Sequence, residues 1–184
     1  RRRLGVAVEL AAVCDRRVEA EARALGLGRK VFRIRDPQEL LRQDVDMIVE
    51  LLGGLEAPRR LVLGALGMGR HVVTANKRLL SHCWGPVQRA ALKGGGRLYF
   101  EGSVAGGIPL IQSLDNGLAA ARIEQIYGIL NGTTNYILSR AEAGLDMEEA
   151  LLEAQEKGFA EKDPAMDLSG RDTAQKISVL ASLI

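Results

Sequence analysis

The sequence is poor in aromatic residues and in cysteine, and each shortage excludes a class of function. Tryptophan, tyrosine and phenylalanine make up 4% of the 184 residues, too few for the stacked rings with which proteins bind single-stranded nucleic acid. The two cysteines, Cys14 and Cys83, form no Cys-x-x-Cys pair. A disulfide framework and a cysteine-rich zinc site are therefore excluded.

Neither sign of charge is in excess, and long apolar runs are absent. Lysine and arginine number 25 against 23 aspartates and glutamates, so a basic surface for nucleic acid is not expected, and Arg1–Arg3 is too short for a basic arm. No apolar run is long enough to cross a membrane, and no signal peptide is recognisable. We expect a cytoplasmic globular protein without nucleic-acid or membrane partners, built as one large domain or two small ones.

Segments typical of strands and of helices alternate over the first hundred residues. The predicted strands are 4–13, 31–34, 45–52, 71–75 and 98–101, and the predicted helices are 18–25, 58–68 and 86–92. This alternation predicts an α/β fold with a Rossmann-type parallel sheet and right-handed crossovers. Such sheets bind ligands at the carboxyl ends of their strands.

The chain lacks the Gly-x-Gly-x-x-Gly turn with which a dinucleotide-binding sheet begins. It instead opens inside what would be the second strand. Asp15 then stands where an acidic residue can bind the ribose hydroxyls of adenosine, and Arg16 and Arg17 are placed to attract a 2′-phosphate. Asp15 can equally cap the helix that begins near Arg17. Spacing alone leaves both interpretations open.

After residue 101 the pattern changes, and we expect two domains, 1–103 and 104–184. An apolar segment covers 110–118, and 123–130 is predicted to be a strand. Asp146 caps a helix that Gly158 ends, and Gly170 precedes a final helix. The inward residues expected on that final helix, with Lys176 beside them, are Ala174, Ile177, Ala181 and Ile184.

Residues 158–176 contain four carboxylates and end at Lys176. Asp172 and Lys176 are four residues apart, so their side chains can meet on a helix. A lysine ammonium held by a carboxylate suits protonation of an oxygen that gains negative charge. The same spacing is typical of an ordinary surface pair worth a few tenths of a kcal/mol. A calcium loop of the EF-hand type is excluded because Leu168 stands where glycine is required.

Two further groups carry weaker signals. The Glu101 side chain and the carbonyls of Val104, Gly106 and Ile108 can present oxygen atoms to a cation, although a turn that ends a strand has the same pattern. Lys77 follows the strand predicted at 71–75, where parallel sheets bind ligands. Taken alone it is no more than a surface lysine.

Five motifs together resemble those of homoserine dehydrogenases. They are Val-Glu-Leu-Leu-Gly-Gly at 49–54, Val-Val-Thr-Ala-Asn-Lys at 72–77, Glu-Gly-Ser-Val-Ala-Gly-Gly-Ile-Pro at 101–109, Gly-Ile-Leu-Asn-Gly-Thr-Thr-Asn-Tyr at 128–136, and the acidic segment 158–176. The last two, in this order and spacing, are the most specific. The resemblance extends from Asp15 to Ile184.

This resemblance implies NAD(P)-dependent interconversion of aspartate 4-semialdehyde and homoserine, a step in threonine, methionine and isoleucine biosynthesis. Hydride passes between the nicotinamide and the aldehyde carbon, and the alkoxide is protonated. By likeness to the family, Lys176 donates that proton, which an oriented ammonium in a dry site favours. Asp172 orients Lys176 and contacts the substrate.

The other roles also follow from the resemblance. The residues that it assigns to the amino-acid end of the substrate are Gly158, Glu161 and Asp167. Those that it assigns to the cofactor, either NADP or NAD, are Asp15, Arg16, Gly53 and Lys77. It also makes Lys77 a catalytic residue near the nicotinamide and the substrate. Those that it assigns to a monovalent cation, expected to be sodium, are Glu101, Val104, Gly106 and Ile108. It further implies an α+β substrate and dimerisation domain and a homodimer in the full-length protein.

The departures from the family pattern lead to further expectations. The first strand and its glycine turn are absent, and the chain stops inside the substrate domain, so we expect a fragment that binds NADPH poorly and shows no turnover by itself. A non-catalytic relative that serves as a binding module is disfavoured because Lys77, Glu161, Asp172 and Lys176 are all present. Another oxidoreductase of similar build, such as an aspartate dehydrogenase or dihydrodipicolinate reductase, is disfavoured by the turn at 131–135.

Overall fold

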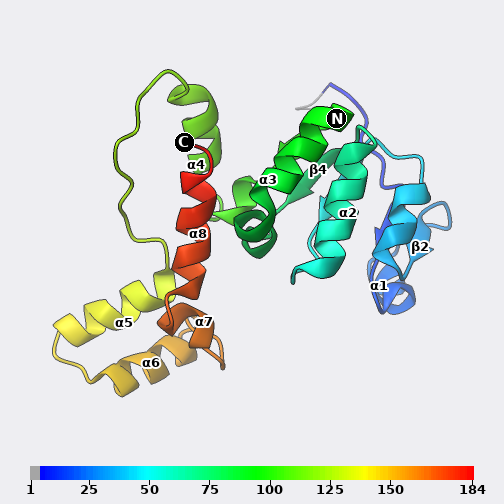
Figure 1. Ribbon diagram of the computed structural model, residues 1–184. Coiled ribbons are helices and arrows are strands. Elements are labelled where there is room, and N and C mark those ends of the chain that lie inside the picture. Colours follow the sequence, from blue (N-terminus) through cyan, green and yellow to red (C-terminus); the bar gives the residue numbers. More distant parts are fainter. Residues whose placement is uncertain (1–4) are drawn as a thin grey trace. The chain divides into compact units, whose positions relative to one another are not determined.

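The computed structural model describes residues 5–184, so Arg1–Arg3 and the first residue of the strand predicted at 4–13 lie outside the described part (Figure 1). The chain forms two compact units. One comprises the described residues up to Thr74 together with Gly85–Tyr99, and the other comprises Ala75–Trp84 and Phe100–Ile184. Within residues 5–184, no helix has both the length and the apolar character needed to cross a membrane.

The first unit is an α/β structure with parallel strands, as predicted. Strands β1 (Ala12–Cys14) and β2 (Phe32–Ile34) pair with each other, and β3 (Met47–Glu50), β4 (His71–Thr74) and β5 (Leu98–Tyr99) form a second sheet in that order. Helices α1 (Val18–Ala24) and α2 (Glu56–Gly67) and the 3-10 helix η1 (Pro37–Arg42) connect them. The strand predicted at 4–13 is far shorter, because β1 finds a partner over only three residues.

The core of the first unit lies where α2 packs against β3 and β4. The side of α2 that faces this core carries Leu61, Val62, Ala65 and Leu66, each no more than 1% exposed. The spacing of these residues follows the period of a helix with one buried face. The sheet contributes Ile48 and Val72, which are register partners.

Two glycines let backbone segments of the first unit approach closely. A Cβ atom on Gly94 would lie 2.0 Å from the carbonyl oxygen of Leu66, and one on Gly96 would lie 2.3 Å from that of Arg70. No side chain fits at such distances. The glycine-rich turn before β5 is therefore a packing requirement at the end of α2.

Helix α3 (Lys77–Gly94) begins nine residues earlier than the helix predicted at 86–92, and it is bent. Cys83 leaves helical geometry, with φ −127° and ψ 21°, just before Pro86. Proline lacks an N–H and its ring clashes with the carbonyl four residues earlier, so a helix bends ahead of it. The division between the two units falls in this bend.

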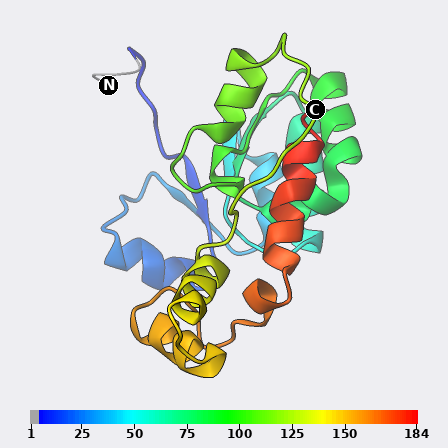
Figure 2. The ribbon, with the colours of Figure 1, turned by 90° about the vertical axis from the view of Figure 1, so that its left-hand side faces the viewer.

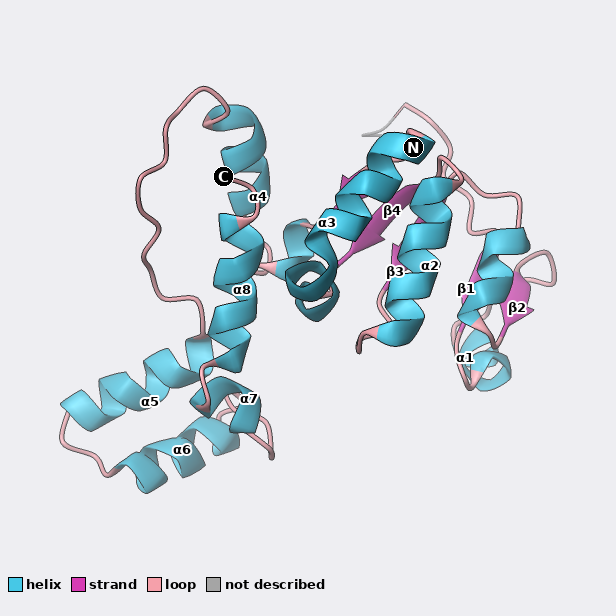
Figure 3. Cartoon of the chain, viewed as in Figure 1, coloured by secondary structure: helices cyan, strands magenta, loops and turns pink. Residues whose placement is uncertain are grey.

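The second unit is helical over the residues described, and Figure 3 shows no strand in it. Its elements after α3 are the short helices η2 (Glu101–Ser103) and α4 (Leu110–Gln112), the π-helical turn η3 (Ser113–Gly117), and helices α5 (Gly132–Glu142), α6 (Met147–Glu156), α7 (Ala165–Leu168) and α8 (Arg171–Ala181). The strand predicted at 123–130 is wrong. A strand needs a neighbour for its main-chain hydrogen bonds, and no other strand of this unit lies within residues 75–84 or 100–184.

Helices α5 and α6 form a hairpin in which the two lie side by side, as Figures 1 and 2 both show. The predicted cap is confirmed, since Asp146 accepts a hydrogen bond from the Glu148 N–H at 2.9 Å. Gly158, with φ +74°, follows the end of α6 as predicted. Ala150 and Ala154 of α6 are fully buried against Ile137 of α5.

A charged network crosses the outside of this hairpin. The Glu153 carboxylate of α6 contacts Arg140 of α5 at 2.7 Å and Lys157 at 2.5 Å, and Lys157 also donates to the Tyr136 hydroxyl at 2.8 Å. Hydrogen bonds from Lys157 and then Arg140 lower the pKa of Glu153 to about 2. The ionised carboxylate thus joins the two helices.

We expect Glu153→Gln to lower the thermal unfolding midpoint at neutral pH. Because the pKa of Glu153 is lowered in the folded state, its ionised carboxylate stabilises the folded protein fully at any pH above the ordinary carboxyl pKa range. This stabilisation is lost as the pH falls through about 2. The difference from wild type should therefore shrink toward zero in strong acid. Circular dichroism melts measure it, with Glu156→Gln, an exposed glutamate of the same helix, as the control. An equal shift in the control would contradict the network's role.

Candidate functional site

The candidate site of the second unit is centred on Asp172, which lies between two lysines. One carboxylate oxygen, Oδ1, is 2.6 Å from Lys77 Nζ, and the other, Oδ2, is 2.6 Å from Lys176 Nζ. The predicted contact between Asp172 and Lys176 is confirmed. The contact with Lys77, at the first residue of α3, joins parts of the chain that are remote in sequence.

The buried face of α8 differs from the expected one. Asp172, Val179 and Leu180 are its buried residues, the Lys176 side chain is 18% exposed, and Ala174 is exposed. The predicted inward set of Ala174, Ile177, Ala181 and Ile184 is wrong, since only Ile177 is even partly buried and Ile184 is 57% exposed. The expected inward face of α8 was chosen from its apolar residues. It was misplaced because the Asp172–Lys176 ion pair, in which each charge offsets the other, lies on the inward side.

The carboxyl group of Asp172 remains ionised although it is only 4% exposed. Burial by itself raises the pKa of Asp172, but hydrogen bonds from Lys176, Lys77 and Asn131 outweigh that effect and hold it at about 2. At neutral pH the site therefore contains an ionised carboxylate between two lysine side chains. The two lysine ammonium groups suit a ligand that carries or develops negative charge.

The Lys176 ammonium has a second partner in the main chain. Its Nζ donates to the carbonyl oxygen of Leu130 at 2.7 Å, besides the contact with Asp172. An ammonium has three N–H groups, and within residues 5–184 two of them are directed at these partners. The third is available for an oxygen atom of a ligand.

Asn131 is a member of this site that the sequence interpretation missed, having treated it only as part of a turn. Its Nδ2 donates to Asp172 Oδ2 at 2.9 Å and to Asp167 Oδ1 at 2.7 Å. Its Oδ1 accepts from the main-chain N–H of Thr134 at 2.8 Å, which makes it the N-cap of α5. An asparagine that precedes a helical segment is the signal that could have identified this second role.

Of the residues that the resemblance assigns to the substrate, the structure brings only Asp167 to Asp172, through Asn131. Glu161 lies exposed in the loop after α6, and within the described chain no hydrogen bond or ion pair joins its side chain to Asp172 or Lys176. Gly158 is exposed at the start of the same loop. This loop is tied to α5 by a hydrogen bond of 2.6 Å from the Thr133 hydroxyl to the Phe159 carbonyl.

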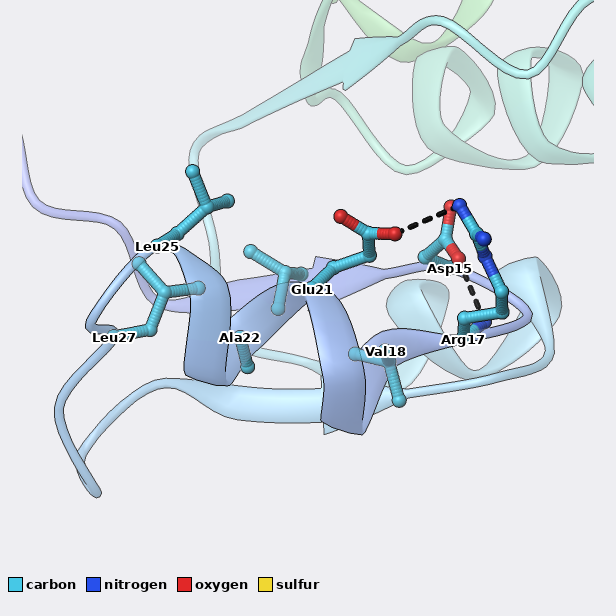
Figure 4. Close-up of a pocket in the computed structure, with 8 residues that line it drawn as sticks. Asp15, Arg17, Val18, Glu21, Ala22, Leu25 and Leu27 are labelled. Atoms are coloured by element: carbon cyan, nitrogen blue, oxygen red, sulfur yellow. Dashed lines mark hydrogen bonds and ion pairs between the residues drawn. The ribbon is translucent and has the colours of Figure 1, made fainter.

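The residues assigned to the cofactor's ribose and phosphate lie in the first unit. Asp15 Oδ1 accepts from the main-chain N–H of Arg17 at 2.6 Å, and the Arg17 guanidinium pairs with Glu21 at 2.8 Å (Figure 4). Asp15 thus stabilises the turn before α1, but it is not the helix cap that one interpretation expected, because the N-cap position is Arg17 and has no side-chain cap. Its second oxygen leaves it able to accept a ribose hydroxyl as well. Arg16 is exposed beside it.

A pocket of about 410 Å³ lies between β1 and α1 and includes the Asp15 carboxylate. Its other lining residues, all drawn in Figure 4 and all but the first labelled there, are Val13, Arg17, Val18, Glu21, Ala22, Leu25 and Leu27. The lining combines apolar side chains with the carboxylates of Asp15 and Glu21 and the guanidinium of Arg17. The reactive groups around Asp172 belong to the other unit.

At the end of β3 the structure adds a second residue that the sequence interpretation missed. Glu50 is 1% exposed; its Oε1 accepts from the Leu52 N–H at 2.7 Å, and its Oε2 accepts from the Thr74 hydroxyl at 2.6 Å. It thus joins the ends of β3 and β4 and supports Gly53, whose φ of +70° favours glycine. A glutamate inside an apolar strand that ends in Gly-Gly was the available signal.

The residues assigned to a monovalent cation surround the turn from η2 to α4. The Glu101 carboxylate accepts from the N–H groups of Ile111 and Gln112 at 2.9 and 3.0 Å. Each oxygen retains the capacity for a second interaction, so these two bonds leave room for a cation. Carboxylate and carbonyl oxygens suit hard cations. Within residues 5–184, no group of three or more His, Cys, Asp or Glu side chains is arranged to hold a metal ion.

Comparison with known proteins gives a consistent set of relatives. A family model described as "Homoserine dehydrogenase, NAD binding domain" matches residues 1–101, and one described as "Homoserine dehydrogenase" matches residues 109–184. The homoserine dehydrogenase of Neisseria gonorrhoeae is 43% identical over 184 residues, which cover 99% of this chain and 42% of that protein. That of Synechocystis sp. is 48% identical over 141 residues, covering 76% and 33%.

Solved structures agree. A homoserine dehydrogenase from Thiobacillus denitrificans matches with a TM-score of 0.83 and 41% identity, covering 94% of this chain and 40% of that one. A hyperthermophilic archaeal homoserine dehydrogenase in complex with NADPH matches with a TM-score of 0.78 and 26% identity, covering 90% and 53%. The chain thus spans 42% or less of the length of the two curated relatives described above.

Proposed function

We propose, from the premise that this chain belongs to the homoserine dehydrogenase family, that the complete protein reduces aspartate 4-semialdehyde to homoserine with NADPH or NADH. The observation that carries the proposal is the pair of ammonium groups held by one buried carboxylate, Lys77 and Lys176 on Asp172. This arrangement provides an oriented proton donor with a second ammonium group on the same carboxylate. The product would serve threonine, methionine and isoleucine biosynthesis.

In the proposed reaction, Lys176 protonates the substrate oxygen. Bound NAD(P)H supplies the hydride that reduces the aldehyde carbon. The third N–H of Lys176 then points at the oxygen where negative charge develops, and it stabilises this charge before it donates the proton. The carbonyl of Leu130 and the carboxylate of Asp172 hold the Lys176 amine in place before and after the proton transfer. In the reverse direction the neutral amine accepts the proton of the homoserine hydroxyl.

Asp172 and Lys77 set the charge of the site. Because the pKa of Asp172 is held at about 2, it keeps its negative charge at the pH of the reaction and keeps both lysines oriented. Lys77 adds a second positive charge, which favours the alkoxide over the neutral aldehyde. We assign Glu161, Asp167 and the main chain at Gly158 to the amino-acid end of the substrate, where a carboxylate can pair with its ammonium group.

The cofactor would be held mainly by residues 1–103, which we propose as the cofactor-binding domain, with 104–184 as the substrate domain. Asp15 would accept a ribose hydroxyl, and Arg16 would reach a 2′-phosphate. The main chain at Gly53 would pass close to the dinucleotide, and Lys77 would lie near the nicotinamide. We further propose a sodium ion bound by Glu101 and the carbonyls of Val104, Gly106 and Ile108, and a homodimer of the complete protein.

Two assays, one for each direction of the reaction, test the proposed function. The complete protein should oxidise homoserine with NADP or NAD, followed by the absorbance of the reduced nicotinamide, and should reduce aspartate 4-semialdehyde in the other direction. Aspartate in place of homoserine is the control, because an aspartate dehydrogenase would use it. Binding of NADPH without turnover of either substrate would overturn the proposal and favour a binding module.

A further inference from the structure

We propose that Asn131 is a positioning residue of the reaction, which holds the Asp172–Lys176 pair in its working geometry through its side-chain amide. This inference rests on the proposed function. The amide nitrogen donates one hydrogen to Asp172 and the other to Asp167, at 2.9 and 2.7 Å. Asn131 is 5% exposed, so water does not readily replace these bonds.

The orientation of this amide is determined by α5. The Asn131 Oδ1 accepts from the Thr134 N–H at 2.8 Å and from the Thr134 hydroxyl at 3.0 Å. A main-chain N–H can only donate, so the oxygen must face the helix and the NH2 group must face the two carboxylates. The helix N-terminus thereby aims both amide hydrogens at the acidic side chains.

The adjoining peptide group holds the other half of the pair. The carbonyl of Leu130, directly before Asn131, accepts from Lys176 Nζ at 2.7 Å. The main chain of Leu130 thus binds the amine of Lys176, and the side chain of the next residue, Asn131, binds the carboxylate of Asp172. Any rotation of Asp172 carries Lys176 with it, because the amine is bonded to the same Oδ2 atom that accepts from Asn131.

The amide also keeps two negative charges in place. Asp167 and Asp172 both bond to the same nitrogen, and each receives its own proton from it. Without these amide hydrogens Asp172 would keep its two lysines, but nothing on the Asn131 side would offset the repulsion between the two carboxylates. Asp172 would then rotate away, and the third N–H of Lys176 would lose its direction toward the substrate oxygen.

Three variants of the complete protein separate this role from helix capping. Asn131→Ser and Asn131→Asp both retain a favoured N-cap for α5, but neither supplies the two amide hydrogens. Asp146→Ala is the matched control, since it removes the N-cap of the adjacent helix α6 and Asp146 does not contact the site. Steady-state kinetics with homoserine and NADP across pH gives kcat and both KM values for each.

We expect kcat to fall by about 10²-fold in Asn131→Ser and Asn131→Asp at mildly alkaline pH, the loss that a small misplacement of reacting groups causes. The KM for NADP should stay near the wild-type value, and Asp146→Ala should retain wild-type kcat. Lowering the pH should restore much of the loss in Asn131→Asp alone, because the new carboxyl group, once protonated, donates a hydrogen bond. Asn131→Ser has no such group and should not recover.

Wild-type kcat in both Asn131 variants, or equal recovery of the two in acid, would overturn the inference. So would a kcat loss of the same size in Asp146→Ala, because capping would then explain it. The proposed function fails separately, if the wild-type protein turns over neither substrate. In that case the acid unfolding of the variants still tests the contact: Asn131→Ser should lose stability at a higher pH than wild type, and an unchanged curve refutes it.

Discussion

Replacing Lys176 with alanine is expected to lower kcat for homoserine oxidation by about 10²- to 10⁴-fold, the range that general acid–base catalysis contributes. The Lys176 ammonium is held at two points, by Asp172 and by the carbonyl of Leu130, whereas Lys77 contacts the other oxygen of Asp172. The affinity for NADPH should change little, since the amine is assigned to the substrate oxygen. Stopped-flow kinetics and fluorescence titration with NADPH measure the two quantities.

Lys162 provides the matched control for this experiment. It is an exposed lysine in the loop after α6, and Lys162→Ala should leave kcat unchanged. A Lys176→Ala enzyme with wild-type kcat would remove the lysine from the mechanism. A parallel loss of kcat and of NADPH affinity would indicate a general defect in folding.

Replacing Asp172 with asparagine is expected to reduce both turnover and stability. The two ammonium groups lose the carboxylate between them, and breaking a buried pair of this kind costs roughly 3 kcal/mol of unfolding free energy. Turnover should fall by about 10²-fold because Lys176 loses its orientation. Urea denaturation and steady-state kinetics check the two effects, with Asp163→Asn in the exposed loop as the control.

The pH dependence of that stability difference follows from the pKa of Asp172, about 2 in the folded protein against an ordinary value of 3.8. A lowered folded-state pKa gives stabilisation that is complete above the ordinary value and is lost as the pH falls through the folded value. The difference between wild type and Asp172→Asn should therefore be constant from neutral pH to about 4 and shrink toward pH 2. A difference that is independent of pH throughout would show that the carboxylate charge is not its source.

Local features of the chain were predictable because they depend on near neighbours. The α6 helix is delimited by the side chain of Asp146 and the left-handed Gly158. The contact between Asp172 and Lys176 needs only one turn of α8. The parallel sheets follow from alternating segments, although β1 has a partner over only three residues.

Errors arose where a distant segment decides the outcome. The segment 123–130 has the composition of a strand, but strand formation depends on a neighbour that composition does not supply. The inward face of α8 was misjudged for a similar reason. A charged residue can lie inward when a partner neutralises it, and here one of the partners, Lys77, belongs to α3.

The sequence alone determined the family of this protein, the order of the parallel strands and connecting helices of its first unit, and the pairing of an acid with an amine one helical turn apart. Only the tertiary structure decided that Lys77 joins this pair and that Asn131 bonds both Asp167 and Asp172. The physical reason is that helix periods and caps act over a few residues, whereas a buried charge is tolerated only where remote segments bring compensating donors to it.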